Sequence, residues 1–280
     1  MNSHLNLLTF EDGNREITKA NGSIYVNEAI ILAAGFGNRI RELTGKIPKP
    51  LLKVGTKSML QYNIEQLIKA NISKIYVVTG YRSKAIRDHI AKLQKILPVQ
   101  LFLVHNSNFH LGNGKSLLTA KNLIKSPYCL LTMVDNCPDF NIFVRAKESV
   151  TAINKVNGMG LCIDRSPRYS FQINDATRVS IKNEAIINIG KKIQKYDGLD
   201  MGVFLLNMRE LKKLNIKKRK LKLTITDIMK YWIDELKRPF IPIDCSGLFW
   251  TDIDTKVDFN VTQAIMPKRS MDHMPVGHHG

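Results

Sequence analysis

Short apolar runs separated by amphipathic stretches fill residues 27 to 135. The run AIIL (29–32) predicts a buried strand, because four consecutive apolar side chains leave no face for solvent. Three later runs have the same character: KIYVVTG (74–80), VQLFLVHN (99–106) and YCLLTMVD (128–135). These runs predict four strands of a sheet that is covered on both faces.

The stretches between the apolar runs have helical spacing. Residues 59–71 place four apolar side chains on one face, behind a predicted N-cap at Ser58. Residues 83–97 and 115–125 predict two further helices. Strands that alternate with helices favour an α/β fold with a largely parallel sheet.

The second half of the chain has a different pattern of apolar and polar residues. Residues 178–192 predict a hairpin that turns near Asn183 and Glu184, and residues 199–207 predict another strand. Residues 224–237 carry apolar side chains at helical spacing, which we interpret as a core face. The predicted organisation is an N-terminal extension (1–26), one domain (27–265) and a flexible tail (266–280).

Composition narrows the class of protein. The chain has 280 residues, of which 44% are hydrophobic, and no apolar run approaches the ~18 residues that cross a bilayer. The first residues lack the pattern of a signal peptide. The cysteines are too scattered for a zinc site or a small disulfide scaffold. We therefore expect a cytoplasmic protein without a transmembrane segment.

The formal net charge of +18 gathers partly in residues 211–222, LKKLNIKKRKLK. Such a stretch can attract nucleic acid or an anionic membrane surface, or it can be a solvated face. No aromatic residues interleave with these lysines, and no nucleic-acid-binding motif lies beside them. We favour the solvated face and expect no nucleic-acid partner.

The loop after the first predicted strand contains the residues that point most clearly to a ligand. In LAAGFGNRIRELTGKIPKP (32–50), Gly35 and Gly37 let the backbone approach a ligand closely, while Arg39 and Lys49 bring positive charge. A phosphate chain is the ligand that this combination suits.

Two familiar phosphate-binding motifs do not fit. A dinucleotide fingerprint needs a third glycine where this chain has Ile40. The segment GNGKS (112–116) has the end of a P-loop, but its pattern requires glycine at the position of Phe109.

The remaining pattern, L-A-A-G-x-G-x-R followed by P-K-P-L-L, resembles the signature of nucleotidyltransferases that act on sugar phosphates. The order and spacing of later segments resemble the inositol-1-phosphate cytidylyltransferases within that group. Those segments are LGNGKSLLTAKN, LTMVDN, DRSPRYSFQINDATRVSIKNEAIINIGKK, LDMGVFLLN and LFWTDIDTKVDFN. The resemblance implies a Rossmann-like three-layer fold with a mixed, mostly parallel sheet.

The resemblance also implies a reaction. A cytidylyltransferase of this family moves CMP from CTP to inositol-1-phosphate and releases CDP-inositol and pyrophosphate, with Mg²⁺ as the cofactor. Members are often fused to a membrane domain that uses the CDP-alcohol, so we expect a separate membrane enzyme as a possible partner here. Other acceptors remain open, namely a hexose-1-phosphate or phosphocholine. An inactive nucleotide- or nucleic-acid-binding relative is a further alternative.

Carried over by position, the family motifs assign ligand-binding roles. Arg39 is expected at the β- and γ-phosphates, Lys49 at the α-phosphate and Lys191 at the acceptor phosphate. The alternative for Lys191 is an exposed lysine at a strand end. The residues expected around the nucleotide are Leu32, Ala33, Ala34, Gly35, Gly37, Gly80, Gly112, Asn113 and Ser116.

The resemblance places the metal site on carboxylates. Asp135 ends an apolar strand, and Asp254 in WTDIDT is the expected second ligand, because hard cations prefer oxygen. Asp252 is the next choice, since alternate residues of an extended strand share a face. As alternatives, Asp135 can cap the turn after its strand, and Asp254 can cap the helix that follows it.

Three positions depart from the family pattern. Val134 and Asn136 stand where a glycine and a histidine are common, and Met201 stands where a threonine is common. None removes a charged group, so they bear on the identity of the acceptor more than on the reaction.

Overall fold

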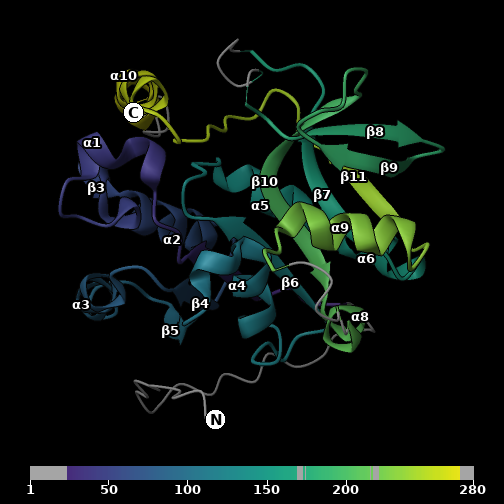
Figure 1. The fold of residues 1–280 in the computed structure, drawn as a ribbon, viewed down its shortest axis with the longest axis horizontal. Coiled ribbons are helices and arrows are strands. Elements are labelled where there is room, and N and C mark those ends of the chain that lie inside the picture. The colour runs from purple at the N-terminus through teal and green to yellow at the C-terminus, as the bar shows by residue number, and fades with distance from the viewer. Residues whose placement is uncertain (1–23, 169–172, 174, 215, 217–220, 272–280) are drawn as a thin grey trace, which may run out of the picture.

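The computed structural model describes residues 24–168, 173, 175–214, 216 and 221–271. Within them, one sheet follows a path of seven strands, with a hairpin attached (Figure 1). In order across the sheet, the path is β11 (Phe240–Asp244), β7 (Met159–Asp164), β10 (Gly198–Asn207), β6 (Tyr128–Met133), β1 (Glu28–Ala33), β4 (Lys74–Thr79) and β5 (Gln100–His105).

The pairing confirms a mixed sheet in which most strands run the same way. β1 is parallel to both β4 and β6, β4 is parallel to β5, and β11 is parallel to β7. Only β10 on this path is reversed, since it pairs antiparallel with β6 and β7. The predicted hairpin is β8 (Arg178–Lys182) and β9 (Ala185–Gly190), and its turn residues Asn183 and Glu184 both have positive φ.

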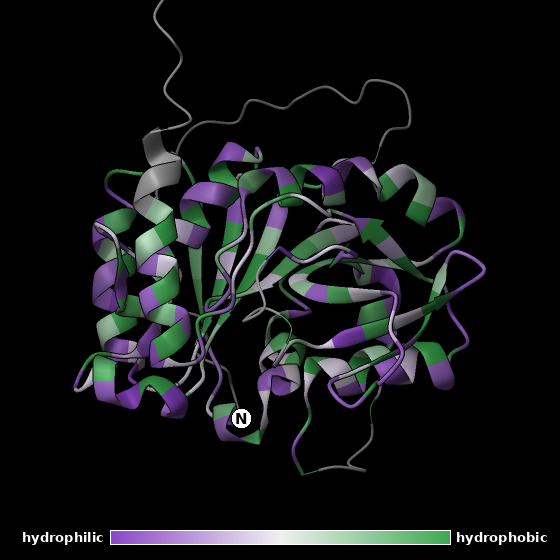
Figure 2. Cartoon of the chain, turned by 90° about the horizontal axis from the view of Figure 1, so that it is seen from above, coloured by the Kyte–Doolittle hydropathy of each residue, from purple (hydrophilic) through white to green (hydrophobic). Residues whose placement is uncertain are grey.

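Helices cover both faces of the sheet, which confirms the three-layer prediction. One face packs against α2 (Met59–Lys69), α3 (Ser83–Leu93), α5 (Phe140–Glu148) and α6 (Val150–Lys155). The other packs against α4 (Asn113–Ala120), α8 (Met208–Lys213) and α9 (Ile225–Asp234). Figure 2 shows the largely hydrophobic strands between two layers of helices whose ribbons alternate between hydrophilic and hydrophobic.

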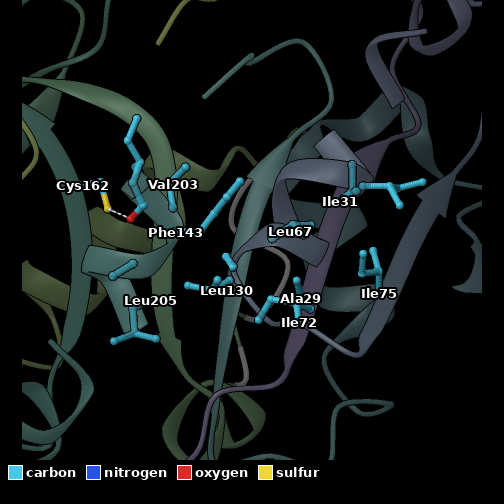
Figure 3. Close-up of a cluster of buried hydrophobic side chains, with 14 of the residues drawn as sticks. Ala29, Ile31, Leu67, Ile72, Ile75, Leu130, Phe143, Cys162, Val203 and Leu205 are labelled. Carbon is cyan, nitrogen blue, oxygen red and sulfur yellow. Dashed lines mark hydrogen bonds between the residues drawn. The ribbon is translucent and has the colours of Figure 1, made fainter. Parts of the chain in front are cut away.

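Each buried strand supplies both core layers. In β1, Ala29 and Ile31 point to the α2 side, whereas Ile30 and Leu32 point to the α4 side, and all four are buried. Figure 3 shows Ala29 and Ile31 in the first layer, together with side chains from other strands and helices. This two-sided burial is the reason that the strands read as continuous apolar runs.

The predicted helices differ from the observed ones mainly at their ends. Ser58 caps α2 as expected, because its hydroxyl accepts the backbone N–H of Gln61 at 3.1 Å. The helix predicted over 115–125 ends at Ala120. Beyond it, the buried carboxylate of Glu28 accepts the backbone N–H groups of Lys125 and Ser126, which turns the chain into β6.

The last described element is α10 (Lys256–Met271), so helical backbone continues past the domain end expected at residue 265. At the other end, Val26 is already buried in the core. Most of the predicted extension and the end of the predicted tail lie outside the described residues. Among the described residues, no helix combines the length and apolar character that crossing a bilayer requires.

Candidate active site

A pocket of about 320 Å³ lies at the carboxyl ends of the central strands. In an open parallel sheet this edge is where ligands bind, between loops that leave neighbouring strands. The lining residues are Leu32, Ala34, Gly35, Gly37, Asn38, Arg39, Lys49, Pro50, Phe109, Asn113, Ser116, Met133, Val134, Asp135 and Asp254.

The glycine loop that follows β1 forms one side of the pocket. It leads into the short 3-10 turn η1 (Asn38–Ile40), which carries Arg39. Gly37 has φ +65°, and a Cβ built on it would lie 2.8 Å from Cβ of Lys49. Any side chain at this position would strain the backbone and displace Lys49, so the glycine brings the loop against the lysine.

Lys49 is held in the 3-10 turn η2 (Lys49–Leu51) between two prolines, and its side chain is only 7% exposed. Its Nζ donates to Asp135 at 2.9 Å and to Asp254 at 2.7 Å. Burial alone would lower the pKa of Lys49, but the charges of Asp135, Asp254 and Asp252 outweigh it and raise the pKa above its ordinary value. The lysine is therefore a permanent buried cation.

Three carboxylates gather around this cation. One oxygen each from Asp135, Asp252 and Asp254 lies within 4.8 Å of the others. Desolvation and the charges of Asp135 and Asp254 raise the pKa of Asp252 well above its usual value; because the residue is exposed, the two neighbouring charges are the firmer cause. A set of hard oxygen ligands at this separation fits a divalent cation such as Mg²⁺ after small movements.

The two alternatives for the predicted metal ligands can be compared with the geometry. Asp254 does not cap α10: the hydroxyl of Thr255 accepts the backbone N–H of Asp258 in the first turn of that helix, and the carboxylate of Asp258 accepts the backbone N–H groups of Asp254 and Thr255. Its carboxylate instead contacts Lys49 and Arg39. Asp135 likewise faces Lys49.

A fourth carboxylate links Arg39 and Lys191, the two remaining predicted cations. Asp175, in the loop before β8, accepts hydrogen bonds from Arg39 and, at 2.7 Å, from Lys191. Partial burial opposes ionisation of Asp175, but the hydrogen bonds from Lys191 and Arg39 hold its pKa below the usual value. A continuous chain of ion pairs thus runs from Lys191 through Arg39 to Lys49.

Lys191 lies at the end of that chain and outside the first pocket. It lines a separate cavity of about 550 Å³ between the end of β9 and α9. Lys192 and Lys230 add positive charge to this cavity, and Asn188 and Thr226 add hydrogen-bonding groups.

The predicted nucleotide residues divide into two groups. Those in the pocket lining are Leu32, Ala34, Gly35, Gly37, Asn113 and Ser116. Ala33, Gly80 and Gly112 do not line it. Ala33 is buried in the core, Gly80 lies beneath the ring of Phe109, and Gly112 packs on the backbone of Leu223.

Sequence reasoning did not single out Asp175 or Phe109 as site residues. The contact between Arg39 and Asp175 joins positions 136 residues apart, and although Asp175 lies within one of the segments that carry the family resemblance, no role was assigned to it. Phe109 appeared only as the residue that breaks a P-loop pattern, yet its ring lines the pocket.

The three departures from the family pattern lie near the carboxylates. Asn136 donates its side-chain amide to the carbonyl of Met201 at 3.2 Å and forms an isolated β-bridge with Asp252. Val134 lines the pocket itself. The departures therefore surround the carboxylate cluster and leave its charged groups unchanged.

Comparison with known proteins agrees with this geometry. The Nucleotidyl transferase family matches residues 28–266. A bifunctional IPC transferase and DIPP synthase of Aquifex aeolicus is 31% identical over 249 residues, which cover 88% of this chain and 53% of that protein. The protein of the same name from Rubrobacter xylanophilus is 30% identical over 240 residues, covering 85% of this chain and 51% of that protein. The chain spans about half the length of these relatives.

The fold has a solved counterpart. The inositol-1-phosphate CTP transferase from T. maritima superposes with a TM-score of 0.72 at 23% identity, over 85% of this chain and 95% of that one. Since the family match extends over most of the chain and includes both the phosphate-type loop and the carboxylate cluster, this protein belongs to the nucleotidyl transferase family.

Proposed function

We propose that this chain is a cytidylyltransferase that transfers CMP from CTP to inositol-1-phosphate, giving CDP-inositol and pyrophosphate. The observation that carries the proposal is the buried Lys49 between Asp135 and Asp254, at the end of a pocket that begins with the glycine loop. The relatives named IPC transferase support the choice of reaction. The name of the solved inositol-1-phosphate CTP transferase suggests the acceptor.

In the proposed reaction, a phosphate oxygen of the acceptor attacks the α-phosphorus of CTP. The bond from that phosphorus to the β-phosphate oxygen breaks, and pyrophosphate leaves with the electron pair. Both reactants are polyanions, so the protein must chiefly neutralise charge and hold the oxygens in line. In this proposal, Lys49 faces the α-phosphate, and Arg39 faces the β- and γ-phosphates.

The acceptor is proposed to enter from the side of Lys191. The second cavity offers Lys191, Lys192 and Lys230 for its phosphate, with the polar groups of Asn188 and Thr226 nearby. Asp175 neutralises Arg39 and Lys191 together, so both substrates would approach the same carboxylate from opposite sides. The ion pairs of Asp175 with Arg39 and Lys191 support this pairing of the two proposed phosphate-binding regions.

Asp135, Asp254 and Asp252 are the residues that would hold Mg²⁺. The ion, when bound, would supply positive charge to the triphosphate. The ammonium of Lys49, which otherwise neutralises these carboxylates, would then be available to a phosphate oxygen. Use of the CDP-alcohol by a separate membrane enzyme, and a cytoplasmic location for the transfer, are part of the same proposal.

The test is a pyrophosphate-release assay with four nucleoside triphosphates and a panel of alcohol phosphates. The panel contains inositol-1-phosphate, a hexose-1-phosphate and phosphocholine. We expect the fastest release with CTP and inositol-1-phosphate, loss of activity in EDTA and recovery with Mg²⁺. Faster release from a hexose-1-phosphate with UTP or dTTP would contradict the acceptor and base while leaving the reaction class intact. No release with any pair would contradict the activity itself.

A further inference from the structure

A buried polar side chain of α2 contacts the backbone on both sides of Asp135. Asn63 lies in the middle of α2 and is 0% exposed. Its side-chain nitrogen donates to the carbonyl of Asn136 at 2.8 Å and to that of Val134 at 3.3 Å. The same nitrogen lies 3.0 Å from the carbonyl of Met59, one turn earlier in the helix. The amide therefore holds the two carbonyls that flank a predicted metal ligand.

The orientation of this amide follows from its neighbours. If its oxygen and nitrogen were exchanged, the oxygen would meet three carbonyl oxygens. In the observed orientation, Oδ1 of Asn63 is buried and has no hydrogen-bond partner in the described part of the chain. A buried acceptor without a partner costs stability, and asparagine is a weaker helix former than leucine or alanine. The stability of α2 therefore does not account for an asparagine at this position, whereas its bonds to the neighbouring turn do.

The turn that contains Asp135 is held from two sides. On the side of α2, the phenol of Tyr62 adds a hydrogen bond to the carbonyl of Pro138 at 3.2 Å, next to the bonds from Asn63. On the other side, the backbone N–H of Ile253 donates to the carbonyl of Asp135 at 3.0 Å. Ile253 lies between the other two carboxylates of the cluster in the sequence. The position of Asp135 relative to those carboxylates thus depends on contacts from both sides.

We propose that Asn63 is a positioning residue for the metal site: by holding the carbonyls of Val134 and Asn136, its amide fixes the direction in which the carboxylate of Asp135 points. The inference rests on the proposed function only in taking Asp135 as a metal ligand. Hydrogen bonds that orient a metal ligand affect metal affinity although they do not touch the ion. Carboxylate oxygens within 4.8 Å of one another need such support, because like charges repel.

The test measures metal binding by the full chain without nucleotide, so that no turnover is involved. Free Mn²⁺, which takes the same kind of oxygen ligands as Mg²⁺, is followed by electron paramagnetic resonance during titration with protein. Asn63→Leu keeps the approximate size of the side chain without its amide, and we expect it to raise the Kd for Mn²⁺ ~10–100-fold. Asn63→Ala should do the same, and it replaces the leucine variant if that protein does not fold. Asp135→Asn should raise the Kd at least as much, which assigns the binding to this site.

Asn207→Leu is the matched control. Asn207 is also buried, at 1% exposure, and its side-chain amide donates to Tyr128 at 3.2 Å and to Asn157 at 2.8 Å. It pairs with the first residue of β6, whereas Asp135 follows the last, so the two asparagines lie at opposite ends of that strand. Both leucine variants should lower the free energy of unfolding in urea, but only Asn63→Leu should weaken Mn²⁺ binding.

Two results with the variants would overturn the proposal. An unchanged Kd in the Asn63 variants would show that Asp135 does not need the amide, and equal weakening in Asn207→Leu would show that only overall stability matters. Absence of Mn²⁺ binding by the parent protein would remove the site that Asn63 is proposed to support, and would overturn the proposal as well. The titration needs neither CTP nor an acceptor, so a failure of cytidylyl transfer leaves its result standing.

Discussion

Lys49 shows the greatest contrast between a residue type and its surroundings. A lysine whose side chain is 7% exposed would ordinarily lose its charge, yet three aspartates keep it charged. Removing one partner of a buried ion pair leaves the other uncompensated, which typically costs about 3–5 kcal/mol. Lys49 thus compensates the charges of Asp135 and Asp254, and it is also the residue proposed to bind the α-phosphate.

Substitution of the two lysines of the proposed site should change different kinetic parameters. Lys49→Ala should lower kcat at least ~100-fold with both substrates saturating, because it removes charge stabilisation from the transferred phosphate. Lys191→Ala should raise the KM for inositol-1-phosphate ~10–100-fold, as loss of a charge-assisted hydrogen bond implies, and leave the KM for CTP within a few-fold. Steady-state kinetics with each substrate varied in turn measures both effects.

A surface lysine provides the control for these variants. Lys57 pairs with Glu65 away from the pocket and has a side chain that is 46% exposed, so Lys57→Ala should leave both parameters unchanged. Weakened CTP binding with normal acceptor binding in Lys191→Ala would reverse the roles proposed for the two lysines.

The sequence predicted the positions of single residues best where those residues belong to a motif near the end of a strand. Arg39, Lys49, Asp135 and Asp254 were all expected near one another, and the structure brings them into one ion-pair network. Asp175 could not be predicted, since its contacts depend on how a loop far along the chain returns to the glycine loop. Their catalytic and binding roles stay predictions.

At the scale of elements, periodicity predicted strands and hairpins better than helix ends. The predicted apolar runs agree closely with β1, β4, β5 and β6, because a strand that is buried on both faces has an almost continuous apolar sequence. The chain between α4 and β6 is held instead by Glu28, which is distant in the sequence and accepts the backbone N–H groups of Lys125 and Ser126. The helix propensities of the residues near Ala120 cannot predict a contact with a residue so far away in the sequence.

β10 contains an irregularity next to a carboxylate whose pKa is raised. Its pairing with β7 shifts register between Asp200 and Phe204, and the carboxylate of Asp200 accepts the backbone N–H of Gly202 at 2.7 Å. Burial raises the pKa of Asp200 to about 7, despite this hydrogen bond. The unfolded chain should ionise at an ordinary value near ~4.

This difference predicts the pH dependence of stability. As pH rises from about 4 to 7, the unfolded state loses the Asp200 proton first, so the folded protein should lose stability relative to Asp200→Asn. The relative loss should be ~1–3 kcal/mol and complete above the folded-state pKa, allowing for partial exposure of the side chain. Urea unfolding of both proteins at pH 4.5, 6 and 8 measures it. Parallel stability curves would show that Asp200 ionises normally.

At the scale of the whole molecule, the architecture followed from the alternation of strands and helices. The reversed direction of β10 did not follow from periodicity, because strand direction leaves no trace in an apolar run. The family resemblance supplied that part of the prediction. The basic stretch at 211–222 lies partly outside the described residues, so the expectation of a solvated face stays a prediction.

The central claim is transfer of the α-phosphoryl group of CTP together with its nucleoside. It can be followed by incubating the protein and Mg²⁺ with inositol-1-phosphate and with CTP labelled either at the α- or at the γ-phosphorus. We predict that the α-label appears in CDP-inositol and the γ-label in pyrophosphate. The γ-label on the inositol phosphate would identify a kinase instead, and an α-label that stays in CTP would contradict cytidylyl transfer to this acceptor.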